Sequence, residues 1–397
     1  MKYIYADNAA TTKMSKTAVD AMLPYLTDYY GNPSSLHTVG QEAAEALAKA
    51  RHDIASCLGA ESDREIYFTS GGSEADNQAI VSAAFIGAKK GKKHIISTKF
   101  EHHAVLHTLN RLEKDGYDVT FLDVGRDGVV KAEDVKNAIR PDTALVTIMY
   151  ANNEIGTIQP IREIGKICRE AGVLFHTDAV QAVGHIPVNV KDDNIDMLSL
   201  SAHKFRGPKG IGVLYCRRGI MLTNLIEGGA QERGKRAGTE NIASIVSMAA
   251  ALKEACDNME SAGKYTAALR DRLAEGLSKI PHSVINGTMA HHVPGTLNMC
   301  FEGIEGESLL LLLDAKGIGA SSGSACTSGS LDPSHVLLSL GLPHEVAHGS
   351  LRLSINEELA EEDVDYIIKS VTEVISYLRG MSPVWEALEK GEQKHVI

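Results

Sequence analysis

One thiol of this chain lies in a segment that lacks the residues needed to bury it. Cys326 occurs in the run Ser-Ser-Gly-Ser-Ala-Cys-Thr-Ser-Gly-Ser, which covers residues 321–330. A structural cysteine usually has apolar neighbours, so this pattern favours a thiol that is used chemically. Four uses remain open on this evidence: a nucleophile, a sulfur carrier, a metal ligand, or an incidental loop residue.

Two other residues could take part in chemistry. Lys204 ends the segment Ser-Ala-His-Lys and is followed by few apolar residues, so it is either a solvated lysine or a Schiff-base lysine with a partly desolvated amine. Asp178 follows an apolar strand pattern. A buried carboxylate there needs a cationic partner, for which a protonated pyridine nitrogen would serve. A helix cap or a structural ion pair is the alternative for Asp178.

A glycine turn and a group of histidines are further candidates. Gly71 and Gly72 lead into a helical pattern, which indicates either a phosphate site at a helix N-terminus or a tight turn with Ser73 as the N-cap. His102, His103 and His107 lie close in sequence, but they lack a glutamate in zincin spacing and a nearby cysteine. The sequence therefore predicts no metal site there.

The elements that must position these residues alternate along the chain. Helical patterns cover residues 41–58, 74–90, 103–114 and 160–171, and strand patterns cover 65–69, 94–97, 144–149, 173–177, 197–200 and 211–216. Repeated β-α units predict an α/β fold with a mostly parallel sheet covered by helices. Ligands of such sheets collect at the carboxyl ends of the strands, where residues 70–73, 152–153, 178 and 201–204 fall.

The pattern changes near residues 258–265, where a helix over 265–280 is predicted to lead into a second lobe. We expect a large domain over residues 15–260. Residues 1–14 and 261–397 then form a smaller α+β domain that carries the Cys326 loop.

Composition limits the partners and the compartment. The chain has 397 residues, 44% of them hydrophobic, and its 40 Lys and Arg against 51 Asp and Glu give a net charge of −11. Without a basic stripe, neither nucleic acid nor a membrane surface is expected as a partner. The six cysteines form no CxxC motif, which is typical of a reducing compartment, and the leucine run at 309–313 is too short to span a bilayer. We expect a cytoplasmic enzyme.

Together these segments resemble the fold-type I pyridoxal-phosphate (PLP) enzymes of the class V aminotransferase group, and specifically the cysteine desulfurases of the NifS/IscS kind. The resemblance covers nearly the whole chain. It is carried by residues 5–12 (Tyr-Ala-Asp-Asn-Ala-Ala-Thr-Thr), 31–35, 101–102, 152–156, 176–181, 201–204, 236–239 and 322–326. It implies a mostly parallel seven-stranded sheet plus a smaller α+β domain.

The resemblance also implies a role for each candidate. The catalytic residues would be Cys326, Lys204, which would hold the cofactor, and His102, which would stack on its ring. The other cofactor-binding residues would be Gly72, Ser73, Ser201 and His203 at the phosphate, Asp178 at the pyridinium nitrogen, Gln181 at the ring hydroxyl, Asn153, and Thr239 from the second subunit of a homodimer. Asn153 and Arg352 would hold the substrate carboxylate, for which the planar fork of arginine is suited. The matching pattern usually has Ala-Thr where this chain has Gly72-Ser73, and serine keeps the hydroxyl.

The implied reaction converts L-cysteine to L-alanine and leaves a persulfide on Cys326. Its sulfur would pass to an iron–sulfur scaffold protein of the NifU/IscU type or to another acceptor, and Cys326 is also a candidate transient ligand of an iron–sulfur cluster. The alternatives are a selenocysteine lyase, a class V aminotransferase without need of Cys326, or a non-catalytic sulfur-trafficking protein. Lys204, Asp178 and Arg352 argue against the last.

Overall fold

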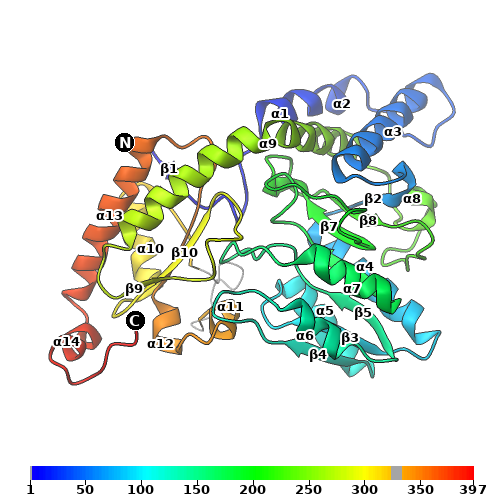
Figure 1. The fold of residues 1–397 in the computed structure, drawn as a ribbon. Coiled ribbons are helices and arrows are strands. Elements are labelled where there is room, and N and C mark those ends of the chain that lie inside the picture. Colours follow the sequence, from blue (N-terminus) through cyan, green and yellow to red (C-terminus); the bar gives the residue numbers. More distant parts are fainter. Residues whose placement is uncertain (1, 323–332) are drawn as a thin grey trace.

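The computed structural model describes residues 2–322 and 333–397 of the chain, so the predictions for Cys326 lie outside the described residues. A seven-stranded sheet forms the centre of the larger part, in the order β2-β8-β7-β6-β5-β3-β4 (Figure 1). Its strands are β2 (Ile66–Thr69), β3 (His94–Thr98), β4 (Asp118–Leu122), β5 (Thr143–Thr147), β6 (Leu174–Asp178), β7 (Met197–Ser201) and β8 (Gly212–Cys216). Only β8 among these strands runs antiparallel to its neighbours. The predicted α/β fold with a mostly parallel seven-stranded sheet is confirmed.

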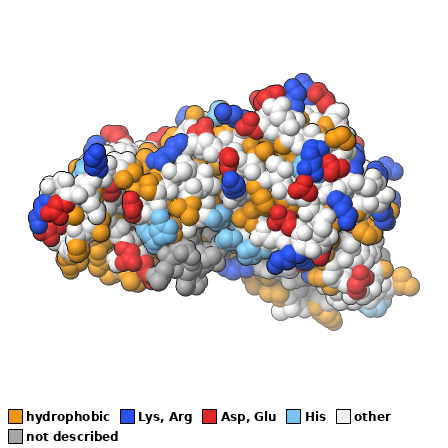
Figure 2. All heavy atoms as spheres, turned by 90° about the horizontal axis from the view of Figure 1, so that it is seen from below, with side chains coloured by type: hydrophobic (Ala, Val, Ile, Leu, Met, Phe, Trp, Pro, Cys, Tyr) orange, Lys and Arg blue, Asp and Glu red, His pale blue; other side chains and the backbone are white. Residues whose placement is uncertain are grey.

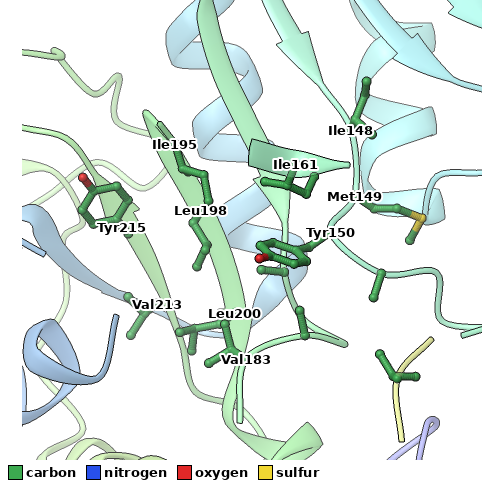
Figure 3. Close-up of a cluster of buried hydrophobic side chains, with 14 of the residues drawn as sticks. Ile148, Met149, Tyr150, Ile161, Val183, Ile195, Leu198, Leu200, Val213 and Tyr215 are labelled. Carbon is green, nitrogen blue, oxygen red and sulfur yellow. The ribbon is translucent and has the colours of Figure 1, made fainter. Parts of the chain in front are cut away.

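Helices cover both faces of this sheet, which explains its continuous apolar strands. Consecutive residues of a strand point to opposite faces, so Ile95, Leu145 and Met197 pack with α4 (Gly72–Ala88) and α5 (His103–Lys114). Their neighbours in sequence pack in the other core with α3 (Thr38–Leu58) and α7 (Ile161–Ala171). Figure 3 shows part of that second core, where Leu198 and Leu200 of β7 lie beside Val213 and Tyr215 of β8.

A smaller antiparallel sheet lies beside the large one, in the order β12-β10-β9 (Figure 1). It consists of β9 (Ser283–Ile285), β10 (Thr296–Phe301) and β12 (Ser350–Ser354), and α10 (Gly306–Ala315) and α13 (Glu361–Arg379) pack with it. The N-terminal strand β1 (Ile4–Tyr5) pairs in parallel with β11 (Ile318–Gly319), and its Ile4 joins the same core. Residues from the two ends of the chain thus share one core.

One helix connects the two sheets. α9 runs without a break over Ile242–Leu277, whereas the sequence predicted a helix over 265–280 only. The prediction was wrong at the N-terminal side, because the earlier apolar residues of α9 pack against α1 (Lys16–Met22) and α3. The expected boundary at residue 260 falls inside this helix.

The remaining elements are short. The helices are α2 (Pro24–Thr27), α6 (Ala132–Ala138), α8 (Gln231–Gly234), α11 (His335–Ser339), α12 (His344–His348) and α14 (Pro383–Glu389), with 3-10 turns at η1 (Asp63–Glu65) and η2 (Ala202–Lys204). In the part of the chain that is described, none of the helices has the length and apolar character needed to cross a bilayer.

Candidate active site

The polar clusters predicted at the carboxyl ends of the strands lie along one edge of the large sheet. Thr69 of β2 and Ser201 of β7 are both paired with Gly212 of β8, so the segments that follow the two strands start side by side. β6 lies next to β7 and ends at Asp178 on the same edge. The sheet order thus brings the segments that follow β2, β6 and β7 to one edge of the sheet.

A cradle for an anion lies where β2 leads into α4. The N-cap of α4 is Gly71, which has no side chain to cap the free N–H groups of the first turn. A Cβ atom on Gly72 would come within 2.6 Å of Val180 Cγ2, and one on Gly212 within 2.7 Å of Gly71 Cα. Gly72 and Gly212 therefore have no room for a side chain. The Ser201 hydroxyl oxygen lies 3.7 Å from the position that a Cβ atom on Gly71 would take. Ser73 is therefore not the N-cap, and its side chain is exposed.

Two other residues that the resemblance assigns to the phosphate, His203 and Thr239, lie outside the turn between β2 and α4. His203 is in η2, and its Nδ1 lies 3.1 Å from the Thr11 hydroxyl. Burial, with the nearby charges of Lys204 and Lys209, lowers the pKa of His203 to about 4, so the ring is neutral at pH 7. Thr239 is exposed in the segment before α9.

Buried carboxyl groups are concentrated around Asp178. Asp178 Oδ1 accepts a hydrogen bond of 2.9 Å from the Val180 N–H, but burial raises the pKa of this carboxyl group. Asp76 of α4 is also buried, and burial together with the charge of Asp178 raises its pKa well above the ordinary value. Burial likewise raises the pKa of Glu101 to about 8. Asp76 Oδ1 has no hydrogen-bond partner among the described residues. This group of acids would be stabilised by a cation.

His102 points toward these acids. It is the N-cap of α5, and its Nδ1 accepts a hydrogen bond of 3.1 Å from the Ala104 N–H. Ligand-type atoms of His102, Asp76 and Asp178 all lie within 4.8 Å of one another. The charge of His102 lowers the pKa of Asp178, against the effect of burial. His102 and Asp178 are therefore close enough to act on the same bound group.

His102, His103 and His107 are close in sequence, but His102 lies farther from the His103 ring than His107 does. The rings of His102 and His103 are 6.4 Å apart, whereas His103 lies 5.1 Å from His107 and 4.7 Å from His335 of α11. Figure 2 shows histidine side chains gathered on the face that is seen from below. Burial and the neighbouring histidines lower the pKa of His103 to about 4.

Lys204 and Gln181 meet at the N-terminal segment. The Lys204 ammonium donates hydrogen bonds of 2.6 Å to the Ala9 carbonyl and 2.9 Å to the Ala10 carbonyl. The Gln181 side-chain amide donates one of 3.0 Å to the same Ala9 oxygen. Lys204 also lowers the pKa of Asp178 through its charge, so the lysine and the acid cluster act on each other.

Arg352 brings the small sheet into the site. It lies in the middle of β12 and is 2% exposed. Its two terminal nitrogens donate hydrogen bonds of 3.0 Å to the Asn153 carbonyl and 2.9 Å to Asp7 Oδ1. Its Nε–H is buried and has no partner among the described residues. A planar fork with an unused N–H edge is suited to a carboxylate.

The N-terminal segment joins the two sheets at this point, which the sequence analysis did not foresee. Asp7 binds Arg352, and the Ala9 N–H donates a hydrogen bond of 2.9 Å to the Ser354 hydroxyl, both on β12. On the other side the carbonyl of Ala9 accepts from Lys204. Asp76 was missed for another reason: in sequence it is one acid within a helical pattern, and only the packing of α4 on the sheet buries it.

These residues fit a phosphorylated pyridine cofactor. The turn at Gly71 and Gly72 suits a phosphate, and the buried acids suit a protonated ring nitrogen. Lys204 supplies an amine whose charge acts on Asp178. A metal ion on Asp76, His102 and Asp178 would satisfy the same acids, but it would leave the cradle and the amine without a role. The fold is that of the fold-type I class, and the chemistry of these residues is suited to a PLP cofactor.

Comparison with known proteins gives the family. The family described as Aminotransferase class-V matches residues 4–367. A cysteine desulfurase IscS of Clostridium botulinum (strain Hall) is 52% identical over 396 residues, which are 99% of both chains. A cysteine desulfurase IscS of Methanosarcina thermophila is 54% identical over 383 residues, which are 96% of this chain and 94% of that protein.

Solved structures agree with these relatives. A NifS-like protein superposes with a TM-score of 0.89 at 38% identity, covering 95% of this chain and 100% of the other. SspA, solved in complex with cysteine, gives a TM-score of 0.79 at 38% identity, covering 89% of this chain and 98% of the other. The chain belongs to the class V aminotransferase family and, within it, to the cysteine desulfurases.

Proposed function

We propose that this protein is a PLP-dependent cysteine desulfurase that converts L-cysteine to L-alanine and collects the sulfur on Cys326. The observation that carries the proposal is the meeting of Lys204, the Asp178 acid cluster and Arg352 through the N-terminal segment. A PLP enzyme that acts on an amino acid needs an amine to hold the cofactor, an acid at the ring nitrogen and a group that binds the substrate carboxylate.

The residues divide the binding work between them. The N-terminus of α4 with Gly72, Ser73, Ser201 and His203 would hold the phosphate, Gln181 the ring hydroxyl, and Asp178 the ring nitrogen. When bound, the cofactor supplies an electron sink for the substrate carbon that loses its proton. Asp178 would keep the ring nitrogen protonated, and His102 would contact the ring. Arg352 and Asn153 bind the substrate carboxylate.

Two residues do the chemistry on the substrate. Lys204 takes up and returns the proton at the substrate Cα as general base and acid. The Cys326 thiolate attacks the substrate sulfur, so that a sulfur–sulfur bond forms while the carbon–sulfur bond breaks. The carbon takes the electron pair and a proton, which gives alanine, and the sulfur stays on Cys326 as a persulfide. Atoms and electrons balance without an external oxidant or reductant.

We further propose that the protein works as a cytoplasmic homodimer that serves an iron–sulfur scaffold protein or another sulfur acceptor. Thr239 is exposed in its own chain, so it is available to complete the phosphate site of a second copy. Exposed apolar residues in the N-terminal region, Leu23, Leu26, Tyr29, Tyr30 and Leu36, offer surface for the same contact. The relatives named IscS favour a role in iron–sulfur cluster assembly.

The decisive experiment compares Cys326→Ala with the wild-type protein. We expect the variant to bind the cofactor, with unchanged visible absorbance, and to release no sulfide from L-cysteine. Cys57→Ser, which alters a half-buried thiol, is the matched control and should keep the wild-type rate. Sulfide release by Cys326→Ala at the wild-type rate would refute the proposal. An aminotransferase or a selenocysteine lyase would be revealed by activity on other amino acids or on selenocysteine that survives the substitution.

A further inference from the structure

Three side chains with metal-binding groups meet at one end of the small sheet. Ligand-type atoms of His282, Glu302 and His395 all lie within 4.8 Å of one another. His282 directly precedes β9, Glu302 directly follows β10, and His395 belongs to the tail beyond α14. Neither the proposed reaction nor the cofactor site uses any of them.

The two sheet residues are fixed independently of the tail. The last register pair of β9 and β10 is Ser283 with Phe301, and one step further the Glu302 N–H donates a hydrogen bond of 3.0 Å to the His282 carbonyl. Side chains opposite each other in this way share a face of the sheet. The buried guanidinium of Arg379 donates to both carbonyls, at 3.0 Å to Glu302 and 3.1 Å to His282.

The tail then supplies the remaining donors. His395 Nδ1 lies 2.7 Å from Glu302 Oε2, and the Val396 N–H donates a hydrogen bond of 2.7 Å to Oε1. The Ile397 main-chain oxygen lies 2.8 Å from His282 Nδ1. In Figure 1 the chain returns from α14 to the small sheet, and its C-terminus lies close to β9. Three side-chain donors thus lie close together, and a main-chain oxygen contacts one of them.

We propose that His282, Glu302 and His395, with the Ile397 carbonyl, form a binding site for a divalent transition-metal ion, with zinc as the best match. Donors at zinc–ligand distances of about 2.0 to 2.2 Å lie about 3.3 Å apart in a tetrahedron. Three of the donor pairs lie 2.7, 2.8 and 3.6 Å apart, so each of these pairs reaches the tetrahedral spacing with a change of under about 1 Å. Two imidazoles, a carboxylate and a carbonyl without a thiolate suit a borderline divalent ion.

Metal binding requires a specific rearrangement of the two rings. The imidazoles are stacked, with centroids 3.6 Å apart and planes 17° apart. To bind a metal, each Nδ1 must present its lone pair, so Nδ1 carries no hydrogen in the metal-bound form and Nε2 carries the ring N–H. The rings must also splay to aim both lone pairs at one ion. The tail allows this movement, because the His395 side chain is 31% exposed.

The ring of Trp385 covers this cluster. It lies edge-on to His282 and to His395, with centroids 5.6 Å away in both cases. Its other neighbour is the Arg379 guanidinium, which lies 3.9 Å from the ring centroid. A bound ion would therefore join β9, β10 and the tail under an aromatic lid and fix the position of residues 393–397.

The first experiment measures zinc binding to the cofactor-loaded protein by competition with a chromophoric chelator. We expect His395→Ala and His282→Ala to lose one equivalent of bound zinc, or at least tenfold in affinity. His348→Ala, which breaks another contact between histidine rings on α12, is the matched control and should bind zinc as the wild-type protein does. Equal zinc binding by the wild-type protein and His395→Ala would overturn the proposal. Cobalt as a probe adds a second criterion, because thiolate ligands from cysteines elsewhere would give charge-transfer bands and this site would not.

The second experiment follows the tail itself. Trypsin cleaves after Lys390, which precedes the segment that the ion would fix, and after Lys394, which lies within it. We expect zinc to slow this cleavage at least tenfold in the wild-type protein and to have no effect in His395→Ala, which alters only the tail and leaves both sheets intact. A cleavage rate that does not depend on zinc in the wild-type protein would show that the cluster is a hydrogen-bonded contact only, which contradicts the proposal.

Discussion

Replacing Arg352 with glutamine should lower kcat/KM for L-cysteine far more than it lowers stability. Arg352 has five N–H groups, of which one binds the Asn153 carbonyl and one binds Asp7. The Nε–H and one N–H on each terminal nitrogen remain, and we expect two of these three groups to bind the substrate carboxylate through two hydrogen bonds.

The magnitude follows from those two bonds. A hydrogen bond to a charged group contributes about 1.5 to 3 kcal/mol, so losing both costs about 3 to 6 kcal/mol. At 1.36 kcal/mol per factor of ten, kcat/KM of Arg352→Gln should fall by about 10² to 10⁴. Arg352→Lys keeps the charge but loses the fork, so about one bond is lost and the fall should be about 10- to 100-fold.

The assay measures alanine formation over a range of cysteine concentrations, with visible absorbance as the check on bound cofactor. Arg270→Gln is the matched control, because Arg270 is another buried arginine, 7% exposed, that binds the Val293 carbonyl in the small domain. We expect that control to lose stability and keep its KM. A kcat/KM of Arg352→Gln within threefold of the wild-type value, with the cofactor bound, would refute the assignment of Arg352 to the substrate carboxylate.

Three further outcomes follow from the structure. Lys204→Ala should lose the visible absorbance of the bound cofactor and all desulfurase activity while the exposed-site control Lys209→Ala keeps both; full activity of the first variant would contradict the role of the lysine. Burial lowers the pKa of His176 to about 3, below its ordinary value of about 6.5, so its neutral ring contributes stability that is fully present above about pH 6.5 and is lost as the pH falls toward 3. When the pH is lowered from 7 to 5, the free energy of unfolding of His176→Asn, measured with urea, should thus fall by about 2 kcal/mol less than that of the wild-type protein. Unfolding free energies of the two proteins that change with pH in parallel would contradict this prediction. Glu232→Gln should cost about 3 to 5 kcal/mol of unfolding free energy, because it breaks a buried bidentate pair with Arg51 at 2.6 and 2.8 Å; a cost below about 1 kcal/mol would show that the pair is not stabilising.

Much of the large domain could be predicted from residue patterns. The helix over 103–114 and the strands near 94–97, 173–177 and 197–200 were placed within a residue or two, because apolar strands that are buried on both faces differ clearly from the helices between them. β4 was missed. It is the edge strand at Asp118–Leu122 and is only partly buried, so its composition does not distinguish it from a loop.

The candidate site divides in the same way. Asp178 and Lys204 could be found because each follows a strand, and strand ends of a parallel sheet meet at one edge. Asp76 could not, since its burial depends on how α4 packs on the sheet. The pairing of Asp7 with Arg352 could not be found either, because these residues lie at opposite ends of the chain and meet only where β12 approaches the N-terminal segment.

The sequence by itself determined the order of β-α units and the family motifs, because local patterning and residue chemistry are properties of short segments. It also supplied Lys204, Asp178 and Arg352 as candidates for the site. The tertiary structure decided which groups share an environment. Burial turns Asp76, Glu101 and Asp178 into one acid cluster with raised pKa values, and no segment of the sequence contains that information. The same is true of His282, Glu302 and His395, which sheet register and the return of the tail bring to one point.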